Sequence, residues 1–509
     1  MKKIETRIND KSKSLLDALR EDGHFLPAYC GGRGTCGKCK VRFLTEAPKA
    51  DDRQQSCLSN QEIEDGWRLA CLTYVDGSCV MEVPDYREDE IAAADSFAAD
   101  ELAAIGSPDV NANRAAADST GHGHSFEGTA LAIDLGTTTI AASLVNISDG
   151  AAFHTVTCLN HQRSYGADVL SRIDAANKGE GRRLQGLVMD DLSYLCRQLG
   201  IAEQIQDVNI PVIISGNTTM EHLLQGLSCQ GLGLYPFTPV DISLHSYGNM
   251  TILPGISTYV GADIVSGILA CDIDRREQVS ILVDLGTNGE MLIGNKDRIL
   301  ATSTAAGPAF EGGNISCGLA GIPGAIDTVH IEDGQTRITT IAGSAPVGIC
   351  GTGVLETVYE LVKEEIVDET GLLDDAWFEE GYPLAEGITF SAKDIREVQL
   401  AKSAIRAGIE ILLVSYGITY DQVDRLYLAG GFGQKINCHK AVGIGMLPEE
   451  LADRIVAVGN SSMNGACMFA ANPELADRFH HITEISEEIN LSNHKLFNDL
   501  YLEHMFFYL

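Results

Sequence analysis

Four cysteines in the first 71 residues have a spacing that suits a metal centre. Three of them lie in YCGGRGTCGKC (residues 29–39), and the fourth ends the stretch GWRLAC. The pattern is C-x5-C-x2-C with a distant fourth cysteine: Cys30, Cys36, Cys39 and Cys71. Four thiolates bind zinc or an iron–sulfur cluster. Zinc ribbons usually pair two C-x2-C knuckles, whereas one such knuckle, a longer gap before it and a remote cysteine favour a 2Fe–2S cluster, with zinc as the alternative.

Glycines separate the first three cysteines. Gly31, Gly32, Gly34 and Gly37 can adopt positive φ, so the loop can wrap a cluster and direct its backbone N–H groups at the sulfurs. Those dipoles and the solvent exposure of the cluster set its potential. Cys57 and Cys79 are not expected to replace any of the four ligands, although Cys57 is expected near the cluster.

Two later segments repeat one pattern. LAIDLGTTTIAASLV (131–145) and ILVDLGTNGEMLIG (281–294) each read as an apolar strand, the turn Asp-Leu-Gly-Thr and a second apolar strand. The turn places an Asp at a strand end beside a glycine whose N–H can meet a phosphate. A third segment, DRLYLAGGFGQKIN (424–437), reads as a strand that runs into a glycine-rich loop able to lie flat against adenosine. The chain has neither a P-loop nor a Rossmann fingerprint, so these three segments carry the prediction of nucleotide binding.

The elements that must position these residues fall into two parts. In residues 1–85, KKIETRI, KCKVRFL and SCVMEVP read as strands, and SLLDALRED reads as a helix capped by Ser14. Residues 86–127 are rich in Ala and acidic residues and predict a flexible linker. From 128 to 509, short β-branched runs alternate with helical patterns, which is typical of α/β units. We expect lobes at about 128–275 and 276–485, and a C-terminal tail at 486–509.

Bulk properties exclude some function classes. The net charge of −34 over 509 residues argues against a nucleic-acid or anionic-membrane partner, and it suits docking to a basic protein surface. No apolar run approaches the ~18 residues that a membrane helix needs. The start has no apolar signal segment, so we expect a cytoplasmic protein, in which most of the fourteen cysteines are reduced core residues.

The three glycine-containing segments resemble the ASKHA superfamily of sugar kinases, actin and Hsp-type chaperones. The resemblance implies that the two Asp-Leu-Gly loops clamp the ATP phosphates, that Asp134 and Asp284 hold Mg²⁺ through water and orient the attacking water, and that YVGADIVSGILA (259–270) is the helix connecting the lobes. It implies these nucleotide-binding residues: Gly136, Thr137, Thr138, Gly286, Thr287, Asn288, Gly261, Asp263, Gly430, Gly431 and Gly433.

A β-grasp 2Fe–2S ferredoxin domain joined to an ASKHA domain resembles the reductive activators of corrinoid proteins. Further stretches are similar to that family, among them NHQRSYGADVLSRI, AAGPAFEGGNISCG and GNSSMNGA. The resemblance implies an α+β ferredoxin domain before a two-lobed α/β ATPase domain. It also implies ATP-dependent, one-electron reduction of Co(II) to Co(I) in a corrinoid protein of a methyltransferase system. An upstream reductase or ferredoxin is the implied electron donor, and the protein is possibly a homodimer.

Some expectations stay open. Larger relatives have a separate middle domain, for which we expect no full equivalent here. The residue that activates the hydrolytic water is not identified, with Glu221 and Glu290 as candidates by position. Two other functions compete: a small-molecule kinase with an appended redox sensor, and an ATP-switched, redox-sensing scaffold or chaperone for a metalloprotein.

Overall fold

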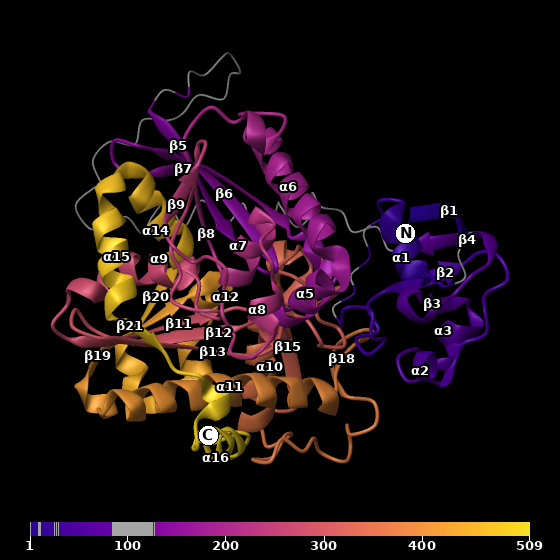
Figure 1. Cartoon of the computed structure of the whole chain (residues 1–509). Helices are drawn as coiled ribbons and strands as arrows, with labels where there is room; N and C mark the ends of the chain where they lie inside the picture. The colour runs from indigo at the N-terminus through magenta and orange to yellow at the C-terminus, as the bar shows by residue number, and fades with distance from the viewer. Residues whose placement is uncertain are drawn as a thin grey trace. The chain divides into compact units, whose positions relative to one another are not determined.

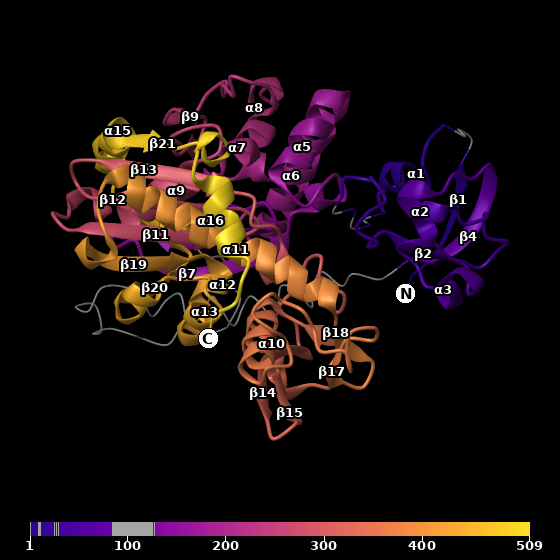
Figure 2. The same cartoon turned by 90° about the horizontal axis from the view of Figure 1, so that it is seen from below.

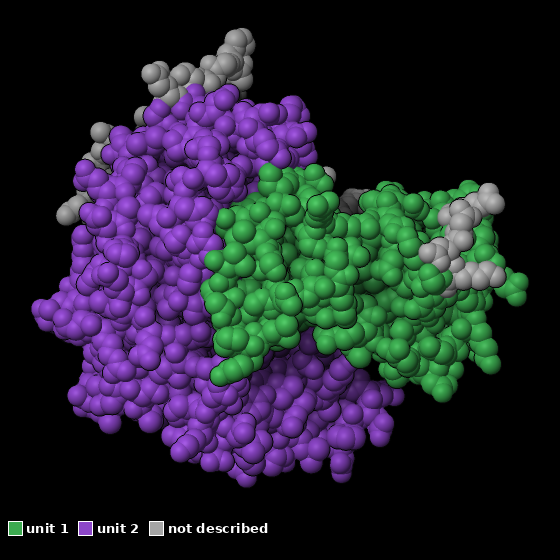
Figure 3. All heavy atoms as spheres, viewed as in Figure 1, with its two compact units in different colours: residues 1–89, 159–191, 222–240 green, residues 90–158, 192–221, 241–509 purple. Residues whose placement is uncertain are grey.

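The computed structural model describes residues 2–8, 12–24, 26, 28, 30–83, 126 and 128–508. The predicted linker at 86–127 therefore lies outside the described residues, apart from residue 126. The chain divides into two compact units (Figure 3). One comprises Met1–Asp89, Leu159–Asp191 and His222–Val240, and the other comprises Glu90–Cys158, Leu192–Glu221 and Asp241–Leu509.

The N-terminal part is an antiparallel sheet of four strands in the order β1-β4-β2-β3. The strands are β1 (Lys2–Ile8), β2 (Lys40–Phe43), β3 (Trp67–Leu69) and β4 (Gly77–Val83). The helices are α1 (Leu15–Glu21), α2 (Asp52–Gln55) and α3 (Asn60–Glu64). Ser14 caps α1 by accepting a hydrogen bond from the Asp17 N–H, and Leu15, Leu16 and Leu19 are buried, so the predicted helix and its cap are confirmed.

Two six-stranded sheets follow, labelled in Figure 1. The first has the order β7-β6-β5-β8-β10-β9, and the second has the order β20-β19-β11-β12-β13-β21. The first sheet contains β5 (Thr129–Leu135), β6 (Thr139–Asn146), β7 (Ala152–Leu159), β8 (Val212–Gly216), β9 (His245–Tyr247) and β10 (Met250–Ile252). The second contains β11 (Val279–Leu285), β12 (Gly289–Gly294), β13 (Ile299–Thr304), β19 (Val423–Ala429), β20 (Ile455–Gly459) and β21 (Ser486–Glu488).

The two sheets repeat one arrangement, which confirms the two similar halves predicted from the Asp-Leu-Gly-Thr segments. In the first, β5 forms an antiparallel hairpin with β6 and pairs in parallel with β8. In the second, β11 forms an antiparallel hairpin with β12 and pairs in parallel with β19. In each hairpin the Asp and Leu of Asp-Leu-Gly-Thr end the first strand and the Gly and Thr begin the turn, so Asp134 and Asp284 take equivalent places near the ends of their strands.

Two helices share one apolar core with both sheets. They are α9 (Ala262–Ala270), which confirms the predicted connecting helix, and α14 (Ser461–Ala471). Their buried residues, such as Ile268 and Ala466, belong to the same core as Ala132 of β5 and Leu282 of β11. This burial anchors the segments that end at the hairpin turns.

The remaining elements complete the α/β architecture. The helices are α5 (Val169–Ala175), α6 (Gly181–Gln198), α7 (Thr218–Gln225), α8 (Gln230–Gly233), α10 (Gly351–Lys363), α11 (Ala392–Tyr416), α12 (Gly430–Lys435), α13 (Cys438–Gly443), α15 (Ala476–Ile485) and α16 (Phe497–Glu503). The small sheets contain β14 (Ala325–Glu332), β15 (Gln335–Thr340), β16 (Gly348–Ile349), β17 (Tyr382–Ala385) and β18 (Ile388–Phe390). None of the helices described is both long and apolar enough to span a membrane.

The C-terminal segment is held against α11, where α16 also packs (Figure 2). The buried Lys402 ammonium on α11 donates to the carbonyls of His504 and Phe506 at 2.5 and 2.6 Å. Burial lowers the pKa of Lys402 to about 7. The predicted tail thus ends in ordered structure whose carbonyl groups satisfy a buried ammonium group.

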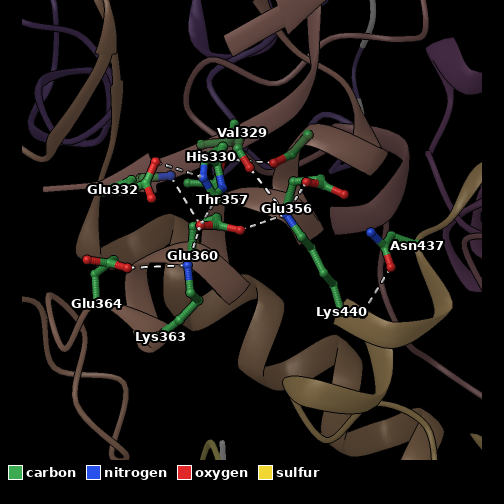
Figure 4. A network of polar contacts seen from close by, with 12 residues as sticks. Val329, His330, Glu332, Glu356, Thr357, Glu360, Lys363, Glu364, Asn437 and Lys440 are labelled. Carbon is green, nitrogen blue, oxygen red and sulfur yellow. Dashed lines mark hydrogen bonds and ion pairs between the residues drawn. The ribbon is translucent and has the colours of Figure 1, made fainter. Parts of the chain in front are cut away.

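A buried ionic network ties α13 to α10 and β14 (Figure 4). Lys440 donates to Glu356, to Glu360 at 2.8 Å and to the Val329 carbonyl at 3.2 Å. Burial opposes ionisation of Glu360, but hydrogen bonds from Lys440 and the Ile331 N–H prevail and lower the pKa of Glu360. The network therefore fixes the helix that follows the glycine-rich α12.

We predict that Lys440→Met lowers the free energy of unfolding by roughly 3–5 kcal/mol at neutral pH, because it removes the cation that bridges the buried carboxylates of Glu356 and Glu360. Chemical denaturation followed by circular dichroism measures this. Lys363→Met is the matched control: Lys363 contacts the same Glu360, but its side chain is 40% exposed and its loss should cost about 1 kcal/mol or less.

The difference between the two variants should also depend on pH. The folded-state pKa of Glu360 is lowered, so its contribution is complete above the ordinary glutamate pKa of 4.5 and is lost as the pH falls through the folded-state value. Equal losses in both variants at neutral pH would contradict the assignment.

Candidate functional site

The four cysteines predicted to hold the cluster lie close together as two hydrogen-bonded pairs. The Cys36 thiol donates to Cys30 and lowers the pKa of Cys30 to about 4, while the pKa of Cys36 is raised. In the same way the Cys71 thiol donates to Cys39 and lowers the pKa of Cys39, while the pKa of Cys71 is raised by Cys39, by burial and by the charges of Cys30 and Cys36. Among the described side chains, no three metal-binding groups converge on one point.

This pairing fits a binuclear centre. In a 2Fe–2S cluster with four cysteine ligands each iron takes two of the thiolates, so two adjacent pairs are the donor set that it needs. Cys30, Cys39 and Cys71 are buried and Cys36 is half-buried. The residues present therefore fit a 2Fe–2S cluster.

The cluster loop has the backbone conformation that its glycines predicted. Gly31, Gly32, Gly34 and Gly37 have φ of +62°, +83°, +76° and +67°. At Gly34 a Cβ would also lie 2.7 Å from the Leu72 Cδ1, so the loop approaches the segment of the fourth cysteine too closely for a side chain.

The two additional cysteines have different surroundings. Cys57 donates to the Gly34 carbonyl at 3.6 Å, which confirms its expected place beside the cluster loop. Cys79 lies in the apolar core of the N-terminal sheet, where burial raises its pKa. Neither belongs to the two thiol pairs.

The second candidate site is a group of half-buried acids. Burial raises the pKa of Asp263 to about 7, and the nearby charge of Asp134 adds to the effect. Burial raises the pKa of Asp284 to about 8, with further increases from Asp263, Asp134 and Glu311. The structure thus brings together the three predicted aspartates from β5, α9 and β11, and a cation or protons must compensate their charge.

Asp134 is held by two residues of the GNSSMNGA stretch. Asn460 Nδ2 and Ser462 Oγ donate to its two carboxylate oxygens, each at 2.7 Å. These hydrogen bonds stabilise the ionised form, but burial prevails and raises the pKa of Asp134. The stretch was identified as similar to the reductive activators, but neither residue was predicted to have a role. Nothing in the local sequence indicates that α14 reaches β5.

Glu311 joins the two predicted phosphate loops. Its Oε2 accepts from Thr138 Oγ1 and from Thr287 Oγ1, both at 2.8 Å, and the two hydroxyl oxygens are 3.1 Å apart. Glu311 ends the short turn Ala309–Glu311 and was not predicted as a site residue. The stretch that contains it, AAGPAFEGG, resembles the reductive activators, but the resemblance assigned Glu311 no role.

Two predicted glycines allow close approaches at this site. A Cβ on Gly261 would lie 2.5 Å from Asn217 Cα and 2.6 Å from the Gly216 carbonyl oxygen, so the start of α9 lies against the turn after β8. Gly430 has φ of +88°, and a Cβ there would lie 2.8 Å from Asp284 Oδ1. The predicted glycine-rich loop is instead the first turn of α12, which begins at Gly430 directly after β19.

The remaining predicted residues line the same turns. Thr137 Oγ1 accepts from Asn217 Nδ2 at 2.9 Å. A Cβ on Gly136 would lie 2.4 Å from the Thr139 carbonyl oxygen, so the first turn requires glycine there. In the second turn, the Gly286 N–H donates to the Asn288 carbonyl at 3.3 Å. In α12, Gly431 has free space at its Cβ position, whereas a Cβ on Gly433 would lie 3.2 Å from Leu428 Cγ.

The two candidates for activating water are both buried. Burial, followed by the charges of Asp263 and Asp241, raises the pKa of Glu221 well above the ordinary value, and its Oε1 has no hydrogen-bond partner. Glu290 lies opposite Asp284 in the β11–β12 hairpin, and burial raises its pKa well above the ordinary value. Burial favours the protonated form of both acids, and that form does not accept a proton from water.

Comparisons with known proteins match three family profiles to successive parts of the chain. The profile described as "2Fe-2S iron-sulfur cluster binding domain" matches residues 1–76. The profile "RACo middle region" matches residues 129–276, and the profile "C-terminal domain of RACo the ASKHA domain" matches residues 278–509. Together with the thiol pairs, the first match confirms the 2Fe–2S interpretation over zinc.

Individual relatives cover most of the chain. The corrinoid activation enzyme RamQ of Eubacterium limosum is 30% identical over 418 residues, which are 74% of this chain and 70% of that protein. The [Co(II) methylated amine-specific corrinoid protein] reductase of Methanosarcina barkeri is 26% identical over 73% of this chain and 76% of its own length. A solved structure, "Reductive activator for corrinoid,iron-sulfur protein", has a TM-score of 0.69 and 26% identity and covers 99% of this chain and 96% of its own.

These matches confirm the predicted fold class, an α+β ferredoxin domain followed by an ASKHA-type α/β domain. They correct one expectation: a counterpart of the middle region is present, at 129–276, within the range that the sequence assigned to the first ATPase lobe. The same range forms the six-stranded sheet that carries the Asp134 hairpin, so the middle-region counterpart and the predicted first lobe are one part of the chain. The exact domain limits and the roles of individual residues stay predictions.

We predict that Gly430→Ala destabilises the protein by about 1–3 kcal/mol, because it strains a positive φ and places a methyl group against Asp284. Thermal unfolding measures the effect. Gly431→Ala is the matched control, since no other heavy atom lies within 4 Å of its Cβ position and alanine favours a helix. Similar melting temperatures for the two variants would contradict the close contact between α12 and Asp284.

Proposed function

The chain belongs to the family of reductive activators of corrinoid proteins, and from this premise we propose that it uses ATP to drive the one-electron reduction of Co(II) to Co(I) in a corrinoid protein of a methyltransferase system. The cobalt is the substrate: Co(I) is the nucleophile in methyl transfer, and occasional oxidation to Co(II) inactivates it. One observation carries the proposal, namely that a single chain contains both two thiol pairs suited to a one-electron centre and two phosphate loops beside half-buried aspartates.

The N-terminal residues have a holding role in this proposal. Cys30, Cys36, Cys39 and Cys71 hold the 2Fe–2S cluster, and their glycine-rich loop directs N–H groups toward its sulfurs. When bound, such a cluster supplies one electron, which is the number that Co(II) requires.

The ATP-side residues bind and orient the nucleotide. The turns after Asp134 and Asp284 offer N–H and hydroxyl donors to the phosphates, and these two aspartates would hold Mg²⁺, which would neutralise phosphate charge when bound. Asn460 and Ser462 orient Asp134, and Gly430 brings α12 against Asp284 for adenosine to bind nearby. ATP hydrolysis then changes how these turns are held, and thereby the affinity for the corrinoid partner.

The energy scale of this coupling is adequate. For one electron, 59 mV corresponds to about 1.4 kcal/mol. A typical coupling free energy of ~3 kcal/mol therefore changes an effective potential by roughly 130 mV. ATP thus makes an unfavourable transfer productive by altering the affinity of the two proteins before and after the electron moves.

Partners and location complete the proposal. We propose that an upstream reductase or ferredoxin donates the electron and that the protein acts in the cytoplasm, and a homodimer is compatible with this proposal. The net charge of −34 suits docking to a basic surface on the corrinoid protein.

The direct test is anaerobic incubation with a Co(II) corrinoid protein, a low-potential reductant and MgATP, followed by visible spectroscopy. We expect Co(I) to form with ATP and not without it. If no Co(I) appears while an established activator produces it from the same corrinoid protein, the proposed function is wrong.

We predict that Cys39→Ser lowers iron binding and abolishes cobalt reduction, while the affinity for ATP stays within about twofold, because the thiol pairs and the acids form separate sites. Iron analysis, the cobalt assay and nucleotide titration measure the three effects. Cys57→Ser is the control and should retain all three properties, since Cys57 only contacts the cluster loop. A Cys39→Ser variant that still promotes Co(I) formation would favour the scaffold interpretation instead.

A further inference from the structure

Glu311 takes the place that a phosphate oxygen would need between the two hairpin turns. Its Oε2 accepts hydrogen bonds from Thr138 and Thr287, which come from different sheets and are 149 residues apart in sequence. Two hydroxyl donors converging on one anionic oxygen form a charge-assisted site for a single negatively charged atom. In this structure that atom is supplied by the chain itself.

We propose that Glu311 is a positioning residue that links the two phosphate loops in the nucleotide-free protein, and that the terminal phosphate of ATP takes over the hydroxyls of Thr138 and Thr287 from it. The inference rests on the proposed function, because it assumes that ATP binds at these two loops.

The number of hydrogen-bond donors indicates that a phosphate oxygen must replace Glu311, because the two threonine hydroxyls cannot bind both anions at once. Each threonine hydroxyl has one hydrogen, and the three oxygens of Thr138, Thr287 and Glu311 lie within 2.8–3.1 Å of one another. Two hydrogens serve three close oxygen pairs, so no donor is left for a further anion. A phosphate oxygen can gain these hydroxyls only if the carboxylate leaves them.

Electrostatics require the same exchange. Glu311 already contributes to the raised pKa of Asp284, so its charge is felt in the half-buried acid group. A terminal phosphate beside a fixed Glu311 carboxylate would add like charge at a half-buried site, where water screens it less than in bulk solution. Moving the carboxylate away removes that repulsion.

The backbone around Glu311 is anchored, so the movement belongs to the side chain. Gly312 has φ of +74°, and a Cβ there would lie 2.2 Å from the Leu319 carbonyl oxygen. Phe310 is buried and stacks on Phe432 of α12, with ring centroids 5.0 Å apart. The same short turn therefore contacts both phosphate loops and the glycine-rich helix, which makes it suited to sensing a complete nucleotide.

The test compares nucleotides with and without the terminal phosphates in full-length protein. Glu311→Gln keeps the size of the side chain and removes its charge, and neutral hydrogen bonds are about half as strong as charge-assisted ones. We expect binding of a non-hydrolysable ATP analogue to tighten about tenfold, while AMP binding stays within twofold. In ATP hydrolysis KM should fall with little change in kcat.

Three results would overturn the inference: unchanged or weaker analogue binding, equal tightening for AMP, or a fall in kcat with KM unchanged, which would place Glu311 in the chemical step. Glu290→Gln is the matched control, because Glu290 lies opposite Asp284 and tests whether loss of any nearby acid is sufficient. An equal gain in that control would also contradict the exchange.

A second variant keeps the inference testable if the Glu311→Gln protein does not fold. Glu311→Asp keeps the charge but is one carbon shorter, so it cannot reach both hydroxyls, and it should also tighten analogue binding; unchanged affinity overturns the inference. Wild-type binding separates this inference from the proposed function. If the wild type does not bind the analogue at all, the proposed function fails, whereas binding that Glu311→Gln leaves unchanged refutes only the role of Glu311.

Discussion

Removal of carboxyl groups from water is the constraint on which the ATPase part of this protein depends. Asp134, Asp263 and Asp284 come from two strands and a helix, and desolvation raises the pKa of each, with the charges of neighbouring acids adding to the effect at Asp263 and Asp284. Keeping such carboxylates close together lowers the stability of the fold unless a cation, bound protons or hydrogen-bond donors compensate their negative charge. The site is therefore suited to a charged ligand, although Asn460 and Ser462 donate to Asp134 and the Ile264 N–H donates to Asp263.

The structure keeps these acids together through backbone approaches rather than through large side chains. Gly261 brings the start of α9 against the turn after β8, and Gly430 brings α12 against Asp284. Both approaches exclude a Cβ, so the positions of the acids depend on residues without side chains. The apolar core that α9 and α14 share with both sheets anchors the elements that carry these turns.

In the cluster-binding part, glycines again determine how closely the functional side chains can approach one another. Four thiols must lie close together without forming disulfides, and the loop that carries three of them needs positive φ at four glycines. In the proposed function, these pairs hold an electron carrier and the acid group holds the nucleotide. Joining both sites in one chain would let the free energy of ATP binding and hydrolysis change the outcome of an electron transfer.

The sequence by itself determined the features that short stretches of residues specify, namely turns, loops and the strands beside them. The spacing of the cysteines predicted the ligands, the glycines predicted the positive φ values, and the repeated Asp-Leu-Gly-Thr predicted two equivalent hairpins. These features are local, because a turn or a loop is specified by a few adjacent residues.

Only the tertiary structure decided which distant residues complete the sites. The pairing of Cys39 with Cys71, the contact of Glu311 with Thr138 and the contact of Asn460 with Asp134 join residues that are 32, 173 and 326 positions apart. No local pattern encodes such contacts, since they arise when separate strands and helices bury a common core. For the same reason α12 begins at Gly430, where the sequence predicted a loop: the packing of β19 against β11 brings that glycine onto Asp284.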